Sequence, residues 1–202
     1  MLGSIAQLLR GFLLILWVLA PGATAQEEAS GEGRDALRSF LRENVNVDSG
    51  FEDRFDAEAW LLLMDARLER YVADRSERIA LLGQIRAAAA RSDLPPDLVL
   101  AVIEVESAFD RFAVSRVGAQ GLMQVMPFWK EEIGRPDDNL THNATNLEYG
   151  CRILQFYLQR EGGALHRALA AYNGSSGSRV YSERVARAWD EHWRTEALDW
   201  SR

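Results

Sequence analysis

Cysteine is almost absent from this chain. Cys151 is the only cysteine among 202 residues, so no disulfide can form within the chain and its stability must come from packing. It belongs to the series Leu147, Cys151, Leu154 and Leu158, whose spacing is that of one helix face. We therefore interpret Cys151 as a buried thiol that packs as a small hydrophobic group, not as a nucleophile.

Basic side chains are outnumbered by acidic ones. The chain has 23 Lys and Arg against 30 Asp and Glu, which gives a formal net charge of -7 at pH 7. Binding to nucleic acid depends on clustered Lys and Arg that release counterions from the phosphates. We therefore expect no nucleic-acid partner, and a neutral or mixed-charge substrate fits the composition better.

Metal-ligating patterns are also lacking. The three histidines, His142, His166 and His192, are too scattered in the sequence to form a metal cluster, and we interpret them as surface or interface residues. The acidic run at 137–139 lacks the ligand spacing and the terminal Glu of a calcium loop. We expect neither a metal nor another cofactor.

Long apolar runs are missing as well. The longest one near the start, 12–20, is well short of the roughly 18 to 20 apolar residues that a membrane-spanning helix needs. Arg10 precedes it and Ala23-Thr24-Ala25 follows it, which is typical of an export signal over 1–25 that is cleaved. An uncleaved membrane anchor is the alternative. We expect a periplasmic or secreted protein with no stable membrane span after cleavage.

No segment alternates polar and apolar residues over the length of a strand, so we predict an all-α fold. A flexible linker is expected at 26–34, a helical N-terminal region at 35–92, a second domain at 93–195 that begins near Pro95-Pro96, and a tail at 196–202. The helices expected in these regions are 35–43, 52–72, 76–91, 97–109, 121–126, 128–133, 146–161, 165–172 and 182–194.

One carboxylate, Glu106, stands beside an apolar stripe formed by Val102, Val105 and Phe109 on the helix at 97–109. Apolar surroundings disfavour the charged form of a carboxyl, which raises its pKa and suits it to act as a general acid. Glu104 lies about 200° away at about 100° per residue and is expected to face elsewhere. On spacing alone, a solvated surface glutamate remains the commoner interpretation.

Four motifs in order change that interpretation. They are E-S-A-F at 106–109, V-S-R-V-G-A-Q-G-L-M-Q at 114–124, A-Y-N at 171–173 and Y-S-E-R-V at 181–185. Together they resemble the soluble lytic transglycosylase family of goose-type lysozyme-like enzymes, over about 94–193. The resemblance implies a lysozyme-like helical domain whose groove binds the glycan strands of peptidoglycan. It also implies cleavage of the β-1,4 bond between N-acetylmuramic acid and N-acetylglucosamine, with formation of 1,6-anhydromuramic ends.

The resemblance also assigns site residues. It implies Glu106 as the sole acid and base, Ser115 and Tyr181 as its supports, and as substrate-binding residues Met123, Gln124, Tyr172 and Asn173. Simpler roles compete with some of these. Ser115 could cap a local turn, and Met123 and Tyr172 could be ordinary core residues.

A second catalytic carboxylate is not evident, although most glycosidases use two. Asp110 shares a helix face with Glu106, but we expect it to have a surface or capping role. A single carboxylate is sufficient when the substrate's own 2-acetamido group stabilises the cationic centre.

Two other functions compete with a lytic transglycosylase: a hydrolytic muramidase on the same fold, and a non-catalytic peptidoglycan-binding assembly factor. A protein partner in the cell-wall or secretion machinery stays unassigned. The connection 174–180 is shorter than is usual in the family, so we expect a shorter or more open groove on that side.

Overall fold

The computed structural model describes residues 54–195. Its elements are α2 (Arg54–Leu68), α3 (Arg75–Arg91), α4 (Pro96–Ser107), α5 (Trp129–Ile133), α6 (Asn143–Arg160), α7 (Leu165–Tyr172), α8 (Val180–Ala188) and the π-helical turn η1 (Trp189–Trp193). The predicted all-α class is confirmed, since the only β pairing in this range consists of two isolated bridges. The expected signal at 1–25, linker at 26–34, helix at 35–43 and tail at 196–202 lie outside the described residues.

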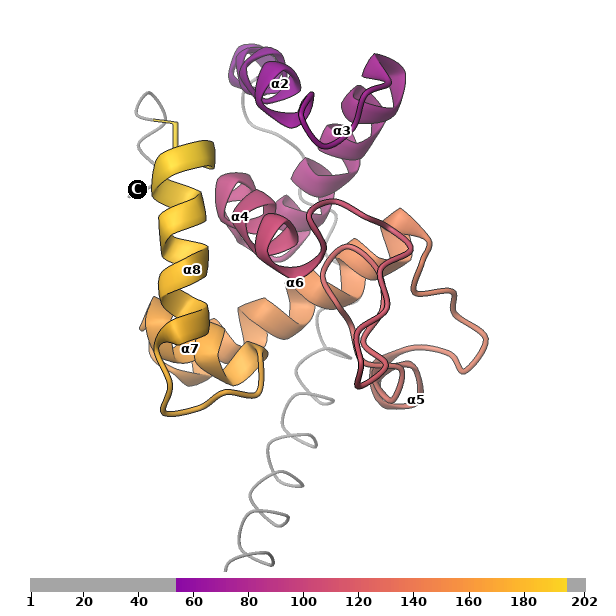
Figure 1. The fold of residues 1–202 in the computed structure, drawn as a ribbon, viewed down its shortest axis with the longest axis vertical. Coiled ribbons are helices and arrows are strands. Elements are labelled where there is room, and N and C mark those ends of the chain that lie inside the picture. The colour runs from indigo at the N-terminus through magenta and orange to yellow at the C-terminus, as the bar shows by residue number, and fades with distance from the viewer. Residues whose placement is uncertain (1–53, 196–202) are drawn as a thin grey trace, which may run out of the picture.

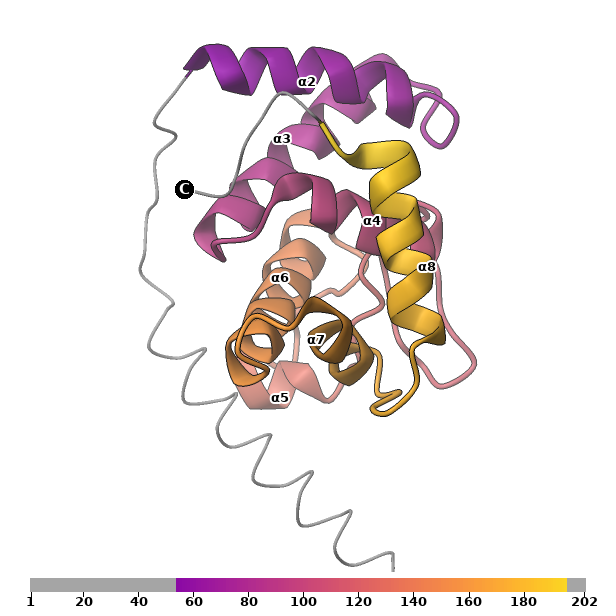
Figure 2. The same ribbon diagram turned by 90° about the vertical axis from the view of Figure 1, so that its left-hand side faces the viewer.

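Helix α4 lies at the centre of the molecule (Figures 1 and 2). In both views the α2–α3 hairpin lies above α4, α6 and α7 lie below it, and α8 lies beside it. Contacts of α4 with α3, α8 and η1, and of α7 with both α6 and α8, join these layers. No helix in the described part of the chain is both long enough and apolar enough to cross a membrane.

The sequence of α4 explains its central place. Pro96 stands at the first helical position, where its missing N–H costs no hydrogen bond, and residues 98–103 are all buried. The helix ends at Ser107, two residues earlier than predicted, because Ala108 (φ 48°) and Phe109 (φ 66°) both adopt left-handed backbone conformations. Each such residue costs about 1–2 kcal/mol. Burial of the Phe109 ring offsets this cost, and its centroid lies 4.9 Å from that of Tyr71 and 5.4 Å from that of Trp193.

Buried polar bonds attach the N-terminal hairpin to the rest of the fold. Asp97, at the start of α4, accepts a hydrogen bond of 2.6 Å from Trp60 Nε1 of α2. Its other carboxylate oxygen accepts from the N–H (3.1 Å) and the hydroxyl (3.0 Å) of Thr195, beyond η1. One buried carboxylate therefore joins α2, α4 and the chain after η1.

The helix predicted at 121–126 is wrong. The segment is a tight turn closed by two backbone hydrogen bonds between Gln120 and Val125, of 2.9 and 3.0 Å. Gly121 (φ +75°) and Gln124 (φ +48°) hold left-handed conformations that an α-helix does not allow. The apolar spacing that predicted a helix reflects burial of Leu122 and Met123, which the turn itself achieves.

The turn depends on having no side chain at Gly121. A Cβ there would meet the Leu140 carbonyl oxygen and would lie 2.5 Å from Asn146 Nδ2. The Asn146 amide donates to the carbonyls of Gln120 and Leu140, both at 2.8 Å, and accepts from the Met123 N–H at 2.7 Å. The Asn146 side chain, which comes from α6, thus occupies the space that Gly121 leaves and fixes the turn.

Candidate active site

Glu106 lies in the last turn of α4, half-buried, and its carboxylate oxygen Oε1 accepts a 2.7 Å hydrogen bond from the Tyr181 hydroxyl. Burial raises the pKa of Glu106 to about 7, although the Tyr181 hydrogen bond and the positive charge of Arg184 act in the opposite direction. At neutral pH a large fraction of Glu106 therefore carries a proton, and the group can both donate and accept one.

Tyr181 reaches Glu106 from the first turn of α8, 75 residues further along the chain. Its side chain is buried, and burial together with the nearby Glu106 raises the pKa of its phenol well above the ordinary value. The phenol therefore stays protonated and can only donate to the Glu106 carboxylate. The hydrogen bond from Tyr181 therefore fixes the orientation of the Glu106 carboxyl group.

Glu106 opens into a cavity of about 210 Å³. The cavity brings together five of the seven residues that the sequence motifs indicated, from the motifs at 106–109, 114–124 and 171–173: Glu106, Ser115, Gln124, Tyr172 and Asn173. Among the described residues that line it, Glu106 is the only acid. Asp110 is exposed and accepts from the N–H of Phe112 at 2.9 Å within a turn, which agrees with a surface role.

Ser115 and Gln124 hold the loop that faces Glu106. The Ser115 hydroxyl accepts from the Ala119 N–H at 3.0 Å, and its own N–H donates to the Ala119 carbonyl at 2.9 Å. Gln124 donates from Nε2 to the carbonyls of Ala113 (3.2 Å) and Gly121 (2.9 Å), which orients its amide in the cavity wall. Ser115 thus stabilises a local turn, which was the simpler of the two roles considered for it, and it also lines the cavity.

Met123 does not line the cavity, so its assignment as a sugar-binding side chain is wrong. The side chain is fully buried, with its sulfur 3.9 Å from the thiol of Cys151 and packed against Gly150. Its main-chain carbonyl accepts a 2.7 Å hydrogen bond from the Tyr172 hydroxyl. Met123 therefore supports the site from the core by fixing Tyr172, whose ring does reach the cavity wall. The buried position of Cys151 agrees with its predicted packing role.

The motifs did not indicate the apolar part of the wall. It consists of Val117, Ala119, Val125, Met126, Trp129 and Ile153. Val117 belongs to the quoted 114–124 motif and lies two residues after Ser115, so the sequence could have indicated that it lines the cavity. Trp129 and Ile153 come from α5 and α6, and no local pattern connects them with Glu106.

Glu104 faces away from the cavity, as predicted. Its carboxylate lies 2.8 and 3.0 Å from His192 Nδ1 and accepts a 2.5 Å hydrogen bond from Trp193 Nε1 of η1. The two glutamates of α4 therefore have different environments, one in the cavity and one in the contact with η1. Among residues 54–195, no group of three His, Cys, Asp or Glu side chains is arranged to hold a metal ion.

Comparison with known proteins places these features in a family. Residues 83–191 match the family model described as the transglycosylase SLT domain. The chain is 37% identical over 92 residues to a transglycosylase of Enterobacteria phage PRD1, covering 46% of this chain and 34% of that protein. It is 30% identical over 126 residues to membrane-bound lytic murein transglycosylase C of Sodalis glossinidius, covering 54% of this chain and 35% of the relative. The chain thus spans about a third of the length of these curated relatives.

Among solved structures, the lytic transglycosylase Slt of Pseudomonas aeruginosa, an inactive mutant, aligns over 85% of this chain and 28% of its own. The identity is 24% and the TM-score 0.43.

Proposed function

Because the chain belongs to the transglycosylase SLT domain family, we propose that it is a peptidoglycan lytic transglycosylase in which Glu106 acts first as acid and then as base. The bond cleaved is the β-1,4 bond between N-acetylmuramic acid and N-acetylglucosamine. The observation that carries the proposal is the Glu106 carboxyl itself. It has a pKa of about 7, an orienting tyrosine and no second acid among the described residues of its cavity.

In the first step protonated Glu106 donates its proton to the glycosidic oxygen. The bond from that oxygen to C1 of the muramic acid breaks, and the N-acetylglucosamine part leaves with a free hydroxyl. Positive charge develops at C1, and the carbonyl oxygen of the 2-acetamido group on the same sugar stabilises it. A second carboxylate is therefore not required.

In the second step Glu106, now a carboxylate, removes the proton from the 6-hydroxyl of the muramic acid. The 6-oxygen forms a bond to C1, which closes the 1,6-anhydro ring and returns Glu106 to its protonated state. No water is consumed. A pKa near 7 suits both steps because neither protonation state is strongly favoured at neutral pH.

The residues of the cavity wall are suited to bind a sugar and to exclude water. The amide groups of Gln124 and Asn173 can hydrogen-bond to sugar hydroxyls and acetamido groups, since both residues line the cavity. Val117, Met126 and Trp129 present apolar surface that contacts sugar C–H groups and reduces access of water to C1. Exclusion of water favours ring closure by the 6-hydroxyl over hydrolysis.

The proposed substrate places the protein at the cell wall, which agrees with the export signal predicted at 1–25. We therefore propose glycan strands as its partner and a periplasmic or secreted location.

Product analysis tests the proposal. Purified sacculi treated with the protein should release muropeptides with 1,6-anhydromuramic ends, identified by mass spectrometry. Hydrolysed reducing ends without anhydro products would instead show a muramidase. Strand binding without any release would show a non-catalytic assembly factor.

Replacing Glu106 by Gln tests the carboxyl directly. We expect release to fall by about 10²–10⁴-fold, the usual contribution of a general acid or base. Asp110→Asn is the matched control, because this exposed carboxylate lies four residues away and outside the cavity. Retained release by Glu106→Gln would remove Glu106 from the mechanism.

A further inference from the structure

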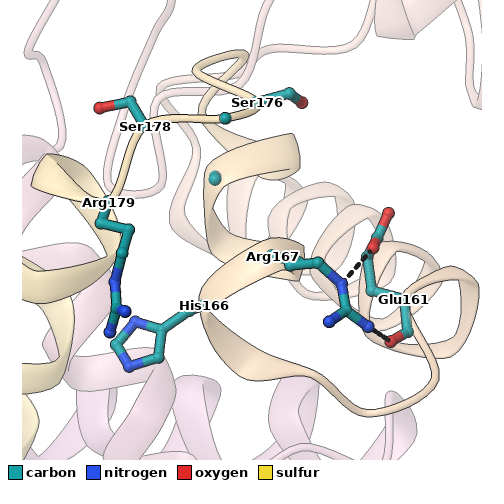
Figure 3. Close-up of a pocket in the computed structure, with 8 residues that line it drawn as sticks. Glu161, His166, Arg167, Ser176, Ser178 and Arg179 are labelled. Atoms are coloured by element: carbon teal, nitrogen blue, oxygen red, sulfur yellow. Dashed lines mark hydrogen bonds and ion pairs between the residues drawn. The ribbon is translucent and has the colours of Figure 1, made fainter.

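A second and larger cavity, of about 450 Å³, lies between α7, the start of α8 and the connection that joins them (Figure 3). Its volume is within the range of about 300–1,000 Å³ that is usual for ligand pockets. The lining includes two arginines, a histidine and two serines: Arg167, Arg179, His166, Ser176 and Ser178, with Glu161 at the margin. None of these residues belongs to the cavity of Glu106.

We propose that this second cavity binds the peptide stem that muramic acid carries, through the carboxylates of that stem. The inference rests on the proposed function and deepens it, since it concerns a different part of the same substrate. Cationic groups concentrated in one cavity are notable in a chain whose net charge is -7.

The two guanidinium groups have donors to spare. Arg167 donates from Nε to the Glu161 carboxylate and from a terminal nitrogen to the Glu161 carbonyl, both at 2.9 Å. Arg179 makes one contact of 3.2 Å with Glu183, between side chains that are 70% and 55% exposed. An arginine has five N–H donors, and exposed ion pairs of this kind contribute only about 0–1 kcal/mol. Both arginines can therefore bind a carboxylate without a large loss.

The polar groups of the cavity match the main chain of a peptide. The Ser182 hydroxyl donates its one proton to the Arg179 carbonyl (3.0 Å), so the hydrogen bond of 3.1 Å between Ser182 Oγ and His166 Nδ1 has the imidazole as donor. When the ring carries its only proton on Nδ1, Nε2 has a lone pair that can accept a peptide N–H. In Figure 3 the His166 ring and the Arg179 guanidinium lie side by side at one end of the cavity.

The position of the cavity relative to Glu106 fits a substrate with two parts. Asn173 lines the cavity of Glu106, and Ser176, which lines the second cavity, is only three positions further along the chain. Three extended residues span at most about 10 Å, and a peptide of similar length attached to a sugar can cover that distance. A glycan in one cavity can therefore place its stem in the other.

Main-chain hydrogen bonds hold the connection that lines the second cavity in place. The Ser175 N–H donates to the Ala170 carbonyl at 2.8 Å, and the Ser178 N–H donates to the Ser175 carbonyl at 2.9 Å. Gly174 (φ +73°) and Gly177 (φ +88°) permit the two reversals that this requires. The short 174–180 connection, which the sequence indicated as unusual, thus forms one side of a cavity that can receive the stem.

The first experiment compares strands that carry stems with strands from which an amidase has removed them. Wild-type protein should have the higher kcat/KM on stem-bearing strands. In Arg167→Ala/Arg179→Ala we expect kcat/KM to fall about tenfold or more on those strands and to stay unchanged on stripped strands. Arg135→Ala, at an exposed arginine outside both cavities, is the matched control. Equal rates of the wild type on both substrates, or an equal loss on both in the double variant, would overturn the inference.

The second experiment measures binding without catalysis. Soluble stem peptide is titrated by calorimetry into Glu106→Gln, with inorganic phosphate as a second probe. We expect the peptide to bind, and its binding to be lost when Arg167 and Arg179 are also replaced by Ala. Phosphate that binds as tightly as the peptide would reveal a general anion site and overturn the peptide assignment. Failure of the proposed function is distinguishable, because the wild type would then release no anhydro product from either kind of strand.

Discussion

Replacing Tyr181 by Phe removes the only side-chain hydrogen bond that the Glu106 carboxyl accepts within residues 54–195. The hydroxyl donates to Oε1 at 2.7 Å and lowers the pKa of Glu106 against the stronger effect of burial. A hydrogen bond to a charged group contributes about 1.5–3 kcal/mol, and one pKa unit corresponds to about 1.4 kcal/mol. We therefore expect the pKa of Glu106 to rise from about 7 by about 1–2 units in Tyr181→Phe.

The sign of the effect on activity follows from the first chemical step. The free enzyme needs protonated Glu106, so activity declines as pH rises through the Glu106 pKa. In Tyr181→Phe that alkaline decline should move to higher pH by about 1–2 units. The maximal rate should fall about tenfold, because the carboxyl is no longer held toward the glycosidic oxygen.

The assay is the pH dependence of kcat/KM for release of soluble products from purified sacculi. Tyr149→Phe is a matched control, since its hydroxyl also donates to a carboxylate, Asp138, at 2.6 Å, but lies outside the cavity of Glu106. An alkaline decline that stays at its wild-type pH in Tyr181→Phe, or moves to lower pH, would refute the reasoning. An equal shift in Tyr149→Phe would show that the effect is not local to Glu106.

Two further predictions concern stability. The folded-state pKa of Glu106 is raised from 4.5 to about 7, so the folded state binds the extra proton more tightly and loses stability as pH rises through that interval. Glu106→Gln should therefore increase the free energy of unfolding by about 1–3 kcal/mol at pH 8 and by little at pH 4, as measured by urea denaturation; a gain of the same size at both pH values would contradict the linkage. Gly121→Ala should destabilise the fold by about 2 kcal/mol or more, because it adds a clash with Asn146 to a left-handed backbone. Gly118→Ala, at φ +89° with open space around its Cβ, should cost only about 1–2 kcal/mol in the same assay, and equal losses would show that the contact with Asn146 does not matter.

Local sequence patterns determined the helices and one end of the site. Apolar periodicity predicted α3, α4, α6 and α7 closely, since a helix that buries one face must repeat its apolar residues at that spacing. The same rule failed at 121–126, where Leu122 and Met123 are buried by a turn that Gly121 permits and Asn146 closes. The quoted motifs placed Glu106, Ser115 and Gln124 on one short stretch because they are neighbours in the chain as well as in space.

Only the tertiary structure decided what surrounds Glu106. Its raised pKa depends on burial in the folded protein, where α8 packs against α4 and the loop at 115–126 lines the cavity. The Tyr181 hydroxyl comes from 75 residues away. Trp129 and Ile153 reach the cavity from α5 and α6, and Met123 turns into the core although its neighbour Gln124 turns outward. Periodicity reports which side of an element is buried, but it carries no information about which distant element buries it. Packing of α4 against α8 and the loop therefore decided the chemistry of a carboxyl that its own helix only positioned.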